Sequence, residues 1–104
     1  MQRIAFKMKL KPGNTEEYVR RHDEIWPELK QLLKDAGISE YSIFLDAETD
    51  TLFAFQKVSG DGGSQNLKEN PIVQKWWNYM ADLMETNADN SPVSVPLQEV
   101  FYMA

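Results

Sequence analysis

The sequence predicts an α+β fold of the ferredoxin-like kind, in which residues 1–104 form one domain with the element order β-α-β-β-α-β. Two observations carry this prediction. Four segments have the patterning of strands, and two amphipathic helical segments separate the first strand from the second and the third from the fourth. A third observation concerns assembly. Aromatic residues fall on both faces of the expected sheet, which favours a homodimer that joins sheet to sheet.

The first strand is expected over residues 3–10. Apolar and polar side chains alternate there, which is the pattern of a strand with one buried face. The segment "KPGN" that follows contains proline and glycine and predicts a turn. The inward-facing side chains are expected to be Ile4, Phe6, Met8 and Leu10.

The first helix is expected to begin after Asn14 and to continue to about Ala36. Asn14 is a favoured N-cap residue, and Glu17 stands three positions later, as in a capping box. Gly37 suits the end of the helix, because glycine readily adopts the left-handed conformation found there. Pro27 lacks the N–H that would bond the carbonyl four residues earlier, so it predicts a kink or a short break.

Two further strands are expected over residues 40–46 ("EYSIFLD") and 51–58 ("TLFAFQKV"). Both are rich in aromatic and β-branched residues, which favour strands. The residues "AETD" between them predict a turn that makes the two strands a hairpin. The next segment, "SGDGGSQN", is dense in glycine and small polar residues and predicts a flexible loop.

The second helix is expected to run from Pro71 to about Met84. Asn70 and Pro71 are typical of an N-cap and a first helical position. The segment "NADNSPVSVP" that follows is dense in turn residues and predicts a loop. The last strand is then expected over residues 97–103, "LQEVFYM".

Composition and charge exclude several classes of function. The net charge of -5 argues against binding to nucleic acid or to an acidic membrane surface. The chain has no cysteine, which removes disulfides, a thiolate nucleophile and cysteine-bound metal sites. No signal peptide and no apolar run of about 20 residues is visible, so we expect a soluble cytoplasmic protein without a membrane partner.

His22 is the only histidine of the chain and falls within the apolar stripe of the first helix. On a helical wheel of about 100° per residue that starts at Tyr18, His22 lies at about 40° and Leu29 at about 20°. Tyr18 stands one turn earlier on the same stripe. Two interpretations remain open, a core histidine bonded to a backbone carbonyl and a general acid/base with a pKa near neutrality. A single histidine without a carboxylate on its stripe predicts no metal site.

Three further aromatic residues favour a sugar-binding pocket. Trp76 and Trp77 lie about 100° apart on the second helix, so one of them is expected at the rim of the core. A tryptophan at a rim can have a structural role, in which it covers the sheet or makes a dimer contact. It can also give a platform on which the C–H face of a sugar packs. Together with Tyr18, His22 and Tyr41, the two indoles suit an uncharged polyol better than an anionic ligand.

The chain resembles the L-rhamnose mutarotase family in "EEYVRRHDEIWPEL", "YSIFLD", "QKWWNYMADLM" and "NADNSPVSVPLQEVFYM". The resemblance covers nearly the whole chain and is weakest over residues 59–69. It implies a homodimeric α/β barrel and an isomerase of carbohydrate metabolism that interconverts the α and β anomers of L-rhamnopyranose without a cofactor. It also implies that His22 is the proton donor and that Tyr18, Tyr41, Trp76 and Trp77 bind the sugar.

Anomer exchange passes through the open aldehyde, and the chemistry needs only a proton donor and a proton acceptor. Our hypothesis from the sequence is that protonated His22 donates to the ring oxygen, while Tyr18 orients the sugar or passes a proton through water. Three alternatives remain at this point. They are a cofactor-independent oxygenase or heme-degrading protein on the same barrel, a non-catalytic sugar-binding module, and a structural dimer.

Overall fold

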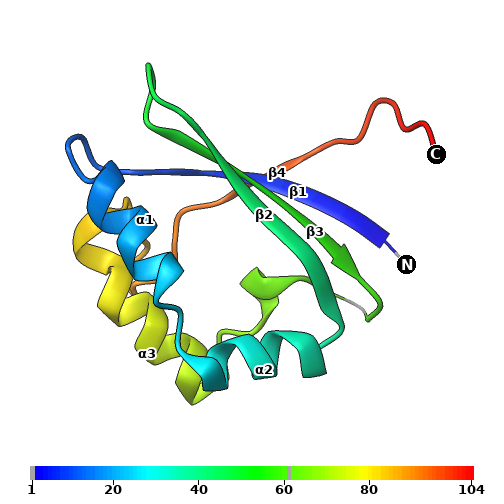
Figure 1. Cartoon of the computed structure of the whole chain (residues 1–104), viewed down its shortest axis with the longest axis horizontal. Coiled ribbons are helices and arrows are strands. Elements are labelled where there is room, and N and C mark those ends of the chain that lie inside the picture. The colour runs from blue at the N-terminus through cyan, green and yellow to red at the C-terminus, as the bar shows by residue number, and fades with distance from the viewer. Residues whose placement is uncertain (1, 61) are drawn as a thin grey trace.

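The computed structural model describes residues 2–60 and 62–104, and its strands form one antiparallel sheet with the order β2-β3-β1-β4. All the helices lie on one face of this sheet (Figure 1). This is the ferredoxin-like arrangement that the sequence predicts. Among the described residues, no helix is long and apolar enough to cross a membrane. The elements in chain order, with η for a turn of 3₁₀ helix, are β1 (Gln2–Lys9), α1 (Thr15–Asp23), α2 (Pro27–Asp35), β2 (Ile38–Asp46), β3 (Thr51–Val58), η1 (Ser64–Asn66), α3 (Pro71–Met80), η2 (Ala81–Leu83) and β4 (Val95–Leu97).

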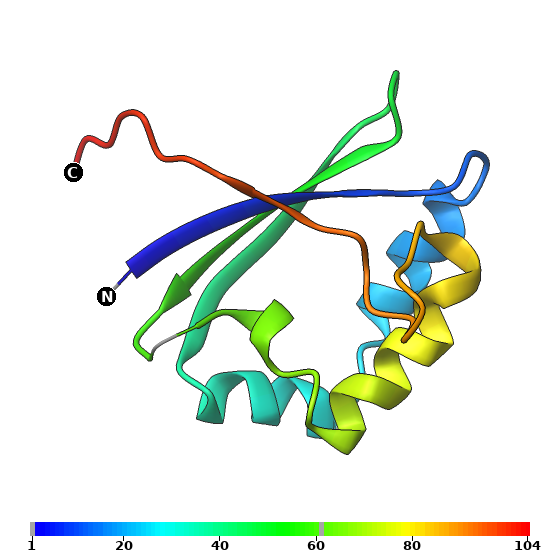
Figure 2. The ribbon, with the colours of Figure 1, turned by 180° about the vertical axis from the view of Figure 1, so that it is seen from behind.

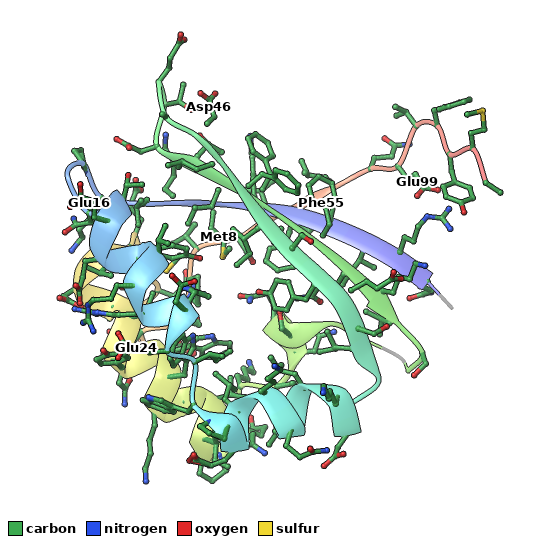
Figure 3. All side chains as sticks on the ribbon, viewed as in Figure 1. Met8, Glu16, Glu24, Asp46, Phe55 and Glu99 are labelled. Atoms are coloured by element: carbon green, nitrogen blue, oxygen red, sulfur yellow. The ribbon has the colours of Figure 1, made fainter. Side chains whose placement is uncertain are left out.

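The core lies between the sheet and the helices. In the register of β1 and β3, Phe6 lies opposite Ala54 and Met8 opposite Leu52, and all four side chains are buried on the helical side. Figure 3 shows Met8 and Phe55 on opposite faces of the sheet. Phe55 is 44% exposed, so the face away from the helices carries uncovered aromatic surface, as the alternation predicted.

The predicted interruption at Pro27 is confirmed, and it is a break rather than a kink. α1 ends at Asp23, and α2 begins at Pro27. Trp26 has an extended backbone, with φ -61° and ψ 131°, because a residue that precedes proline is disfavoured in the helical region. The chain changes direction here, so α2 runs across the sheet at an angle to α1 (Figures 1 and 2).

The predicted capping box at the start of α1 is wrong. The Asn14 side chain donates to two carbonyls of the preceding turn and makes no bond to the first helical N–H groups. Glu17 does not reach back to the cap, because its carboxylate is held by Arg20 and Arg21 one turn later. These charge-assisted bonds lower the pKa of Glu17 from 4.5 to about 2. Two guanidinium partners therefore compete successfully with the neutral backbone amide for this carboxylate.

The second helix begins where the sequence predicts. Asn70 Oδ1 accepts hydrogen bonds from the backbone N–H groups of Ile72 and Val73, at 2.9 Å and 3.4 Å. Pro71 occupies the first helical position, where its missing N–H costs nothing. The α-helix ends at Met80 and continues as the 3₁₀ turn η2, so the predicted single helix to Met84 is slightly too long.

The predicted last strand over residues 97–103 is wrong. β4 is the shorter segment Val95–Leu97, which pairs with residues 5–7 of β1 at the edge of the sheet. Beyond it, residues 98–104 have no regular structure, and Val100 and Phe101 are 87% and 79% exposed. Tyr102 of this tail packs under the guanidinium of Arg3, with 3.3 Å between Arg3 Cζ and the ring centroid. An ion pair of Glu99 with Arg3 ties the tail to β1 before it extends away from the helices (Figure 2).

Candidate functional site

A cavity of about 650 Å³ lies between the helices and the concave face of the sheet. Its size is typical of a pocket for a small molecule. All five residues singled out from the sequence line it, although they come from three different elements. α1 provides Tyr18 and His22, β2 provides Tyr41, and α3 provides Trp76 and Trp77.

His22 lies in the last turn of α1, and its imidazole is half-buried. Its Nδ1 is 3.1 Å from the backbone oxygen of Tyr18. Because a carbonyl oxygen only accepts hydrogen bonds, this contact assigns the proton to Nδ1 and leaves Nε2 as the basic nitrogen. The ring also packs against Tyr18, tilted by 32° with 4.3 Å between the centroids, and it meets the edge of Trp76 at 5.4 Å. The bond to the carbonyl agrees with the first interpretation of His22, and its position on the cavity is what the second interpretation requires.

The surroundings of His22 favour its neutral form. Burial lowers the pKa of the imidazole below 6.5, and it outweighs the opposing effects of the Tyr18 carbonyl and of Asp23. A neutral imidazole with a free Nε2 can accept a proton from a hydroxyl. Among the residues that the structure describes, no three groups of the metal-binding types come together, so no cluster is available to hold a metal ion.

Tyr18 is buried, with 7% of its surface exposed, on the same face of α1 as His22. Burial raises the pKa of its phenol far above the usual value of 10. The hydroxyl therefore keeps its proton over the whole physiological range. Tyr18 can donate or accept a hydrogen bond in the cavity, but it cannot act as a phenolate base.

Tyr41 reaches the cavity because of a bulge in β2. Ser39 pairs with Lys57 and Ser42 with Phe55, so β2 carries one more residue than β3 between these pairs. Glu40 takes a positive φ of 46° at this point. The extra residue shifts the alternation, and it lets both Ile38 and Tyr41 face the helices although they are three positions apart.

The expectation that one tryptophan of α3 lies at the rim is wrong. Trp76 and Trp77 are 8% and 5% exposed, and both line the cavity. The helical wheel assumed a single core centre, whereas α3 borders a cavity. Side chains at two neighbouring positions of α3 can both face this cavity. Trp26, at the break between α1 and α2, packs edge-on against Trp76 at 5.1 Å and supports it from outside the cavity.

Ser64 and Gln65 in η1 are among the polar residues of the cavity wall that sequence reasoning missed. The segment "SGDGGSQN" predicted a flexible loop, but its end is a turn of 3₁₀ helix fastened to Gln56 of β3. A signal was present in the sequence. Gln56 is the only polar residue at the inward-facing positions of β3, and it is 2% exposed. A buried amide requires polar partners.

The model of the L-rhamnose mutarotase family matches residues 3–103. A protein named L-rhamnose mutarotase from Formosa agariphila is 70% identical over 99% of both chains, and one from Bacteroides thetaiotaomicron is 65% identical over 99% of both. The crystal structure of an L-rhamnose mutarotase from Formosa agariphila superposes with a TM-score of 0.93 at 65% identity, covering 100% of both chains. With the matched length and the shared fold, these comparisons place this chain in the L-rhamnose mutarotase family.

Proposed function

We propose that this chain is a carbohydrate isomerase that interconverts the α and β anomers of L-rhamnopyranose, with residues 1–104 acting as one mutarotase domain. Membership of the family supports this function. The observation that carries it is the position of His22, whose Nδ1 lies 3.1 Å from the backbone oxygen of Tyr18 and whose ring borders a cavity walled by two phenols and two indoles.

The mechanism that we propose uses His22 as a proton shuttle. Nε2 accepts the proton of the anomeric hydroxyl while the bond between C1 and the ring oxygen breaks and C1 becomes an aldehyde. The imidazolium then donates that proton to the former ring oxygen. After rotation about the C1–C2 bond, the same two transfers in reverse close the ring on the other face.

One histidine suffices for both transfers, because the two oxygens are attached to the same carbon of the closed ring. We therefore start the cycle from neutral His22, in place of the protonated form that the sequence suggested. The lowered pKa of His22 supports this choice, because the base is then the resting state at neutral pH. No separate second proton acceptor is needed.

The other four residues have binding roles in this proposal. Tyr18 and Tyr41 remain protonated, since burial raises the pKa of each phenol, and they offer neutral hydrogen bonds to sugar hydroxyls. Trp76 and Trp77 offer apolar surface for the C–H groups and the methyl group of the sugar. Discrimination through one methyl group is worth about 1–3 kcal/mol, so related sugars should also react.

Polarimetry of freshly dissolved L-rhamnose tests the function. The rotation of the solution drifts as one anomer relaxes toward the equilibrium mixture, and catalytic amounts of protein should shorten this relaxation in proportion to their concentration. A sugar-binding module would leave the relaxation at its spontaneous rate. The comparisons favour the mutarotase over the oxygenase or heme-degrading alternative, which predicts oxygen uptake or a change in the spectrum of added heme.

We also propose that the chain acts as a cytoplasmic homodimer, joined through the sheet face that its own helices leave open. Phe44 and Phe55 meet edge-on at 5.7 Å on that face and are 61% and 44% exposed. Burial of such a patch is the usual reason for association. Sedimentation velocity should give twice the chain mass for the wild type, and Phe44→Asp should shift the protein toward monomer.

A further inference from the structure

Arg21 joins the end of α1 that carries His22 to the end of α3. Its Nη1 donates to the backbone oxygen of Tyr79 at 2.7 Å and to Asp82 Oδ1 at 2.8 Å, and its Nη2 donates to Asp82 Oδ2 at 3.2 Å. Its Nε donates to Glu17 Oε2, one turn earlier on α1, at 2.7 Å. The side chain is 11% exposed, which is low for an arginine. The guanidinium is therefore a built part of the contact between the two helices.

The position of the Tyr79 carbonyl explains why a cation binds here. It lies in the last turn of α3, where the regular hydrogen bonding of the α-helix ends. The negative end of the helix dipole lies at the same place and favours a positive charge. Arg21 supplies both a donor and that charge to α3. Because Arg21 belongs to α1, the same bonds fix the end of α1 relative to α3.

A cluster of aromatic rings continues this link from the guanidinium to the imidazole. The guanidinium carbon of Arg21 lies 4.5 Å from the ring centroid of Tyr79, and Tyr79 stacks on Trp26 at 5.7 Å. Trp26 meets Trp76 edge-on at 5.1 Å. Trp76 in turn meets the ring of His22 edge-on at 5.4 Å. Each group packs against the next, so a displaced guanidinium removes support from the whole series.

His22 needs such support because α1 ends directly after it. The helix ends at Asp23, and α2 begins only at Pro27. The last turn of a helix frays more readily than its interior. An imidazole that moves a proton between two oxygens must stay within hydrogen-bond reach of both. A displacement of about 1 Å can lower a rate about a hundredfold.

We propose that Arg21 is a positioning residue that holds His22 in place for proton transfer, because it binds the last turn of α1 to the last turn of α3. The inference rests on the proposed function, since it takes His22 to be the group that moves the proton. It goes further by giving Arg21 a role in the rate of the reaction. Tyr41, Trp76 and Trp77 lie on β2 and α3, so sugar binding should depend on Arg21 much less than proton transfer does.

The kinetics of Arg21→Met test this role, because methionine keeps much of the apolar stem and removes every donor. We expect kcat, measured by polarimetry, to fall about tenfold. The dissociation constant of L-rhamnose, measured by tryptophan fluorescence, should rise by no more than about twofold. Arg3→Met is the matched control, because it breaks an exposed ion pair with Glu99, far from α1 (Figure 3). It should keep the wild-type kcat.

The imidazole gives a second readout, which a loss of stability alone would not change. His22 is the only histidine, so its Hε1 proton gives a single NMR resonance. Ring currents of Tyr18 and Trp76 displace this resonance, because their centroids lie 4.3 Å and 5.4 Å away. At a fixed pH of about 8 the imidazole is neutral. In folded Arg21→Met the resonance should move toward that of an unstructured peptide, and in Arg3→Met it should stay at the wild-type position.

Asp82→Ala tests the same link from the other side, and it replaces Arg21→Met if that variant does not fold. The Asp82 side chain is 66% exposed, so its removal leaves the core intact. It takes away the two bonds from Nη1 and Nη2 to the carboxylate. We expect kcat to fall about threefold. The double variant should be no slower than Arg21→Met alone, because both changes break one link.

The outcomes separate this inference from the proposed function. A lower kcat with a displaced imidazole resonance and nearly wild-type affinity supports the positioning role. A wild-type kcat or an unmoved resonance in folded Arg21→Met overturns it, and so does an equal loss of kcat in Arg3→Met, while the wild-type protein still speeds anomer exchange. A loss of affinity as large as the loss of kcat also overturns it. A wild type that does not speed the exchange overturns the proposed function itself.

Discussion

Replacing Gly63 with alanine should destabilise the protein by a steric mechanism that the structure locates. Gly63 has φ -91° and ψ -167°, an extended conformation that alanine adopts without strain. A Cβ atom built at this position, however, would lie 2.3 Å from Ile4 Cδ1 and 2.5 Å from Gln56 Oε1. Both separations are far shorter than the usual contact distance of about 3.5–4 Å.

The two neighbours differ in how easily they can move. The Cδ1 methyl group is the free end of a flexible side chain, so Ile4 can turn away. Gln56 is fixed by its two hydrogen bonds to Ser64, so moving its oxygen breaks at least one of them. Overpacking of about 1–2 kcal/mol and one lost hydrogen bond of about 1 kcal/mol give a total of about 2–3 kcal/mol.

Thermal unfolding followed by circular dichroism measures this cost. For a chain of this length, a loss of about 2–3 kcal/mol lowers Tm by about 10 °C or more. Gly60→Ala is the matched control, because a Cβ atom there meets only the backbone oxygen of Ala36 at an ordinary 3.7 Å. If Gly63→Ala melted at the same temperature as Gly60→Ala, the packing of η1 against Gln56 would be refuted.

The remaining predictions concern the site and its support. Burial lowers the pKa of His22, and the neutral form is the proposed base. We therefore expect kcat to rise with pH through a pKa below 6.5 and then to stay level. A kcat that falls over this range would favour the protonated form. Trp77→Leu should raise KM about tenfold with a smaller effect on kcat, because it removes apolar surface from the cavity wall, and an unchanged KM would exclude a sugar contact. Arg21 donates hydrogen bonds to Asp82 and to the backbone oxygen of Tyr79. Arg21→Met should therefore reduce the free energy of unfolding in urea by about 1–2 kcal/mol. An unchanged urea midpoint would show that these hydrogen bonds contribute nothing to stability.

Much of the fold could be predicted because its signals are local. The break between α1 and α2 follows from Pro27, whose missing N–H and effect on the preceding residue act within a few positions of the chain. Asn70 and Gly37 mark helix ends by equally local chemistry, and Gly37 adopts the expected positive φ of 85°. Asn14 looked equally suitable as a cap, but its side chain found carbonyl partners in the preceding turn instead.

The last strand was misplaced because strand pairing depends on the partner. The alternation of residues 97–103 resembles a strand, yet the chain leaves the edge of β1 after Leu97. Pro96 lies within β4, which is possible because an edge strand has one unpaired side. The apolar periodicity therefore indicates a segment whose side chains favour burial, but it does not show that this segment pairs with β1.

The sequence singled out five residues that line one cavity, but it did not predict the geometry that brings them together. His22 and Tyr18 could be paired from helical spacing alone, since both lie on one stripe of one helix. Tyr41 joins them through a bulge at Glu40 that shifts the alternation of β2 by one residue. Such a bulge has no reliable signature in the sequence. Ser64 could be linked to the site only by asking which partner satisfies the buried amide of Gln56.

The most direct test of the proton-shuttle mechanism is saturation-transfer NMR on equilibrated L-rhamnose, inverting one anomeric proton and observing the other. The samples are the wild type, His22→Gln, and Glu28→Gln as a control for an amide substitution on an exposed helical residue. We expect rapid transfer with the wild type and with Glu28→Gln. His22→Gln should bind the sugar but show transfer only at the spontaneous rate. Transfer at the wild-type rate with folded His22→Gln would contradict the assignment of His22 as the group that moves the proton.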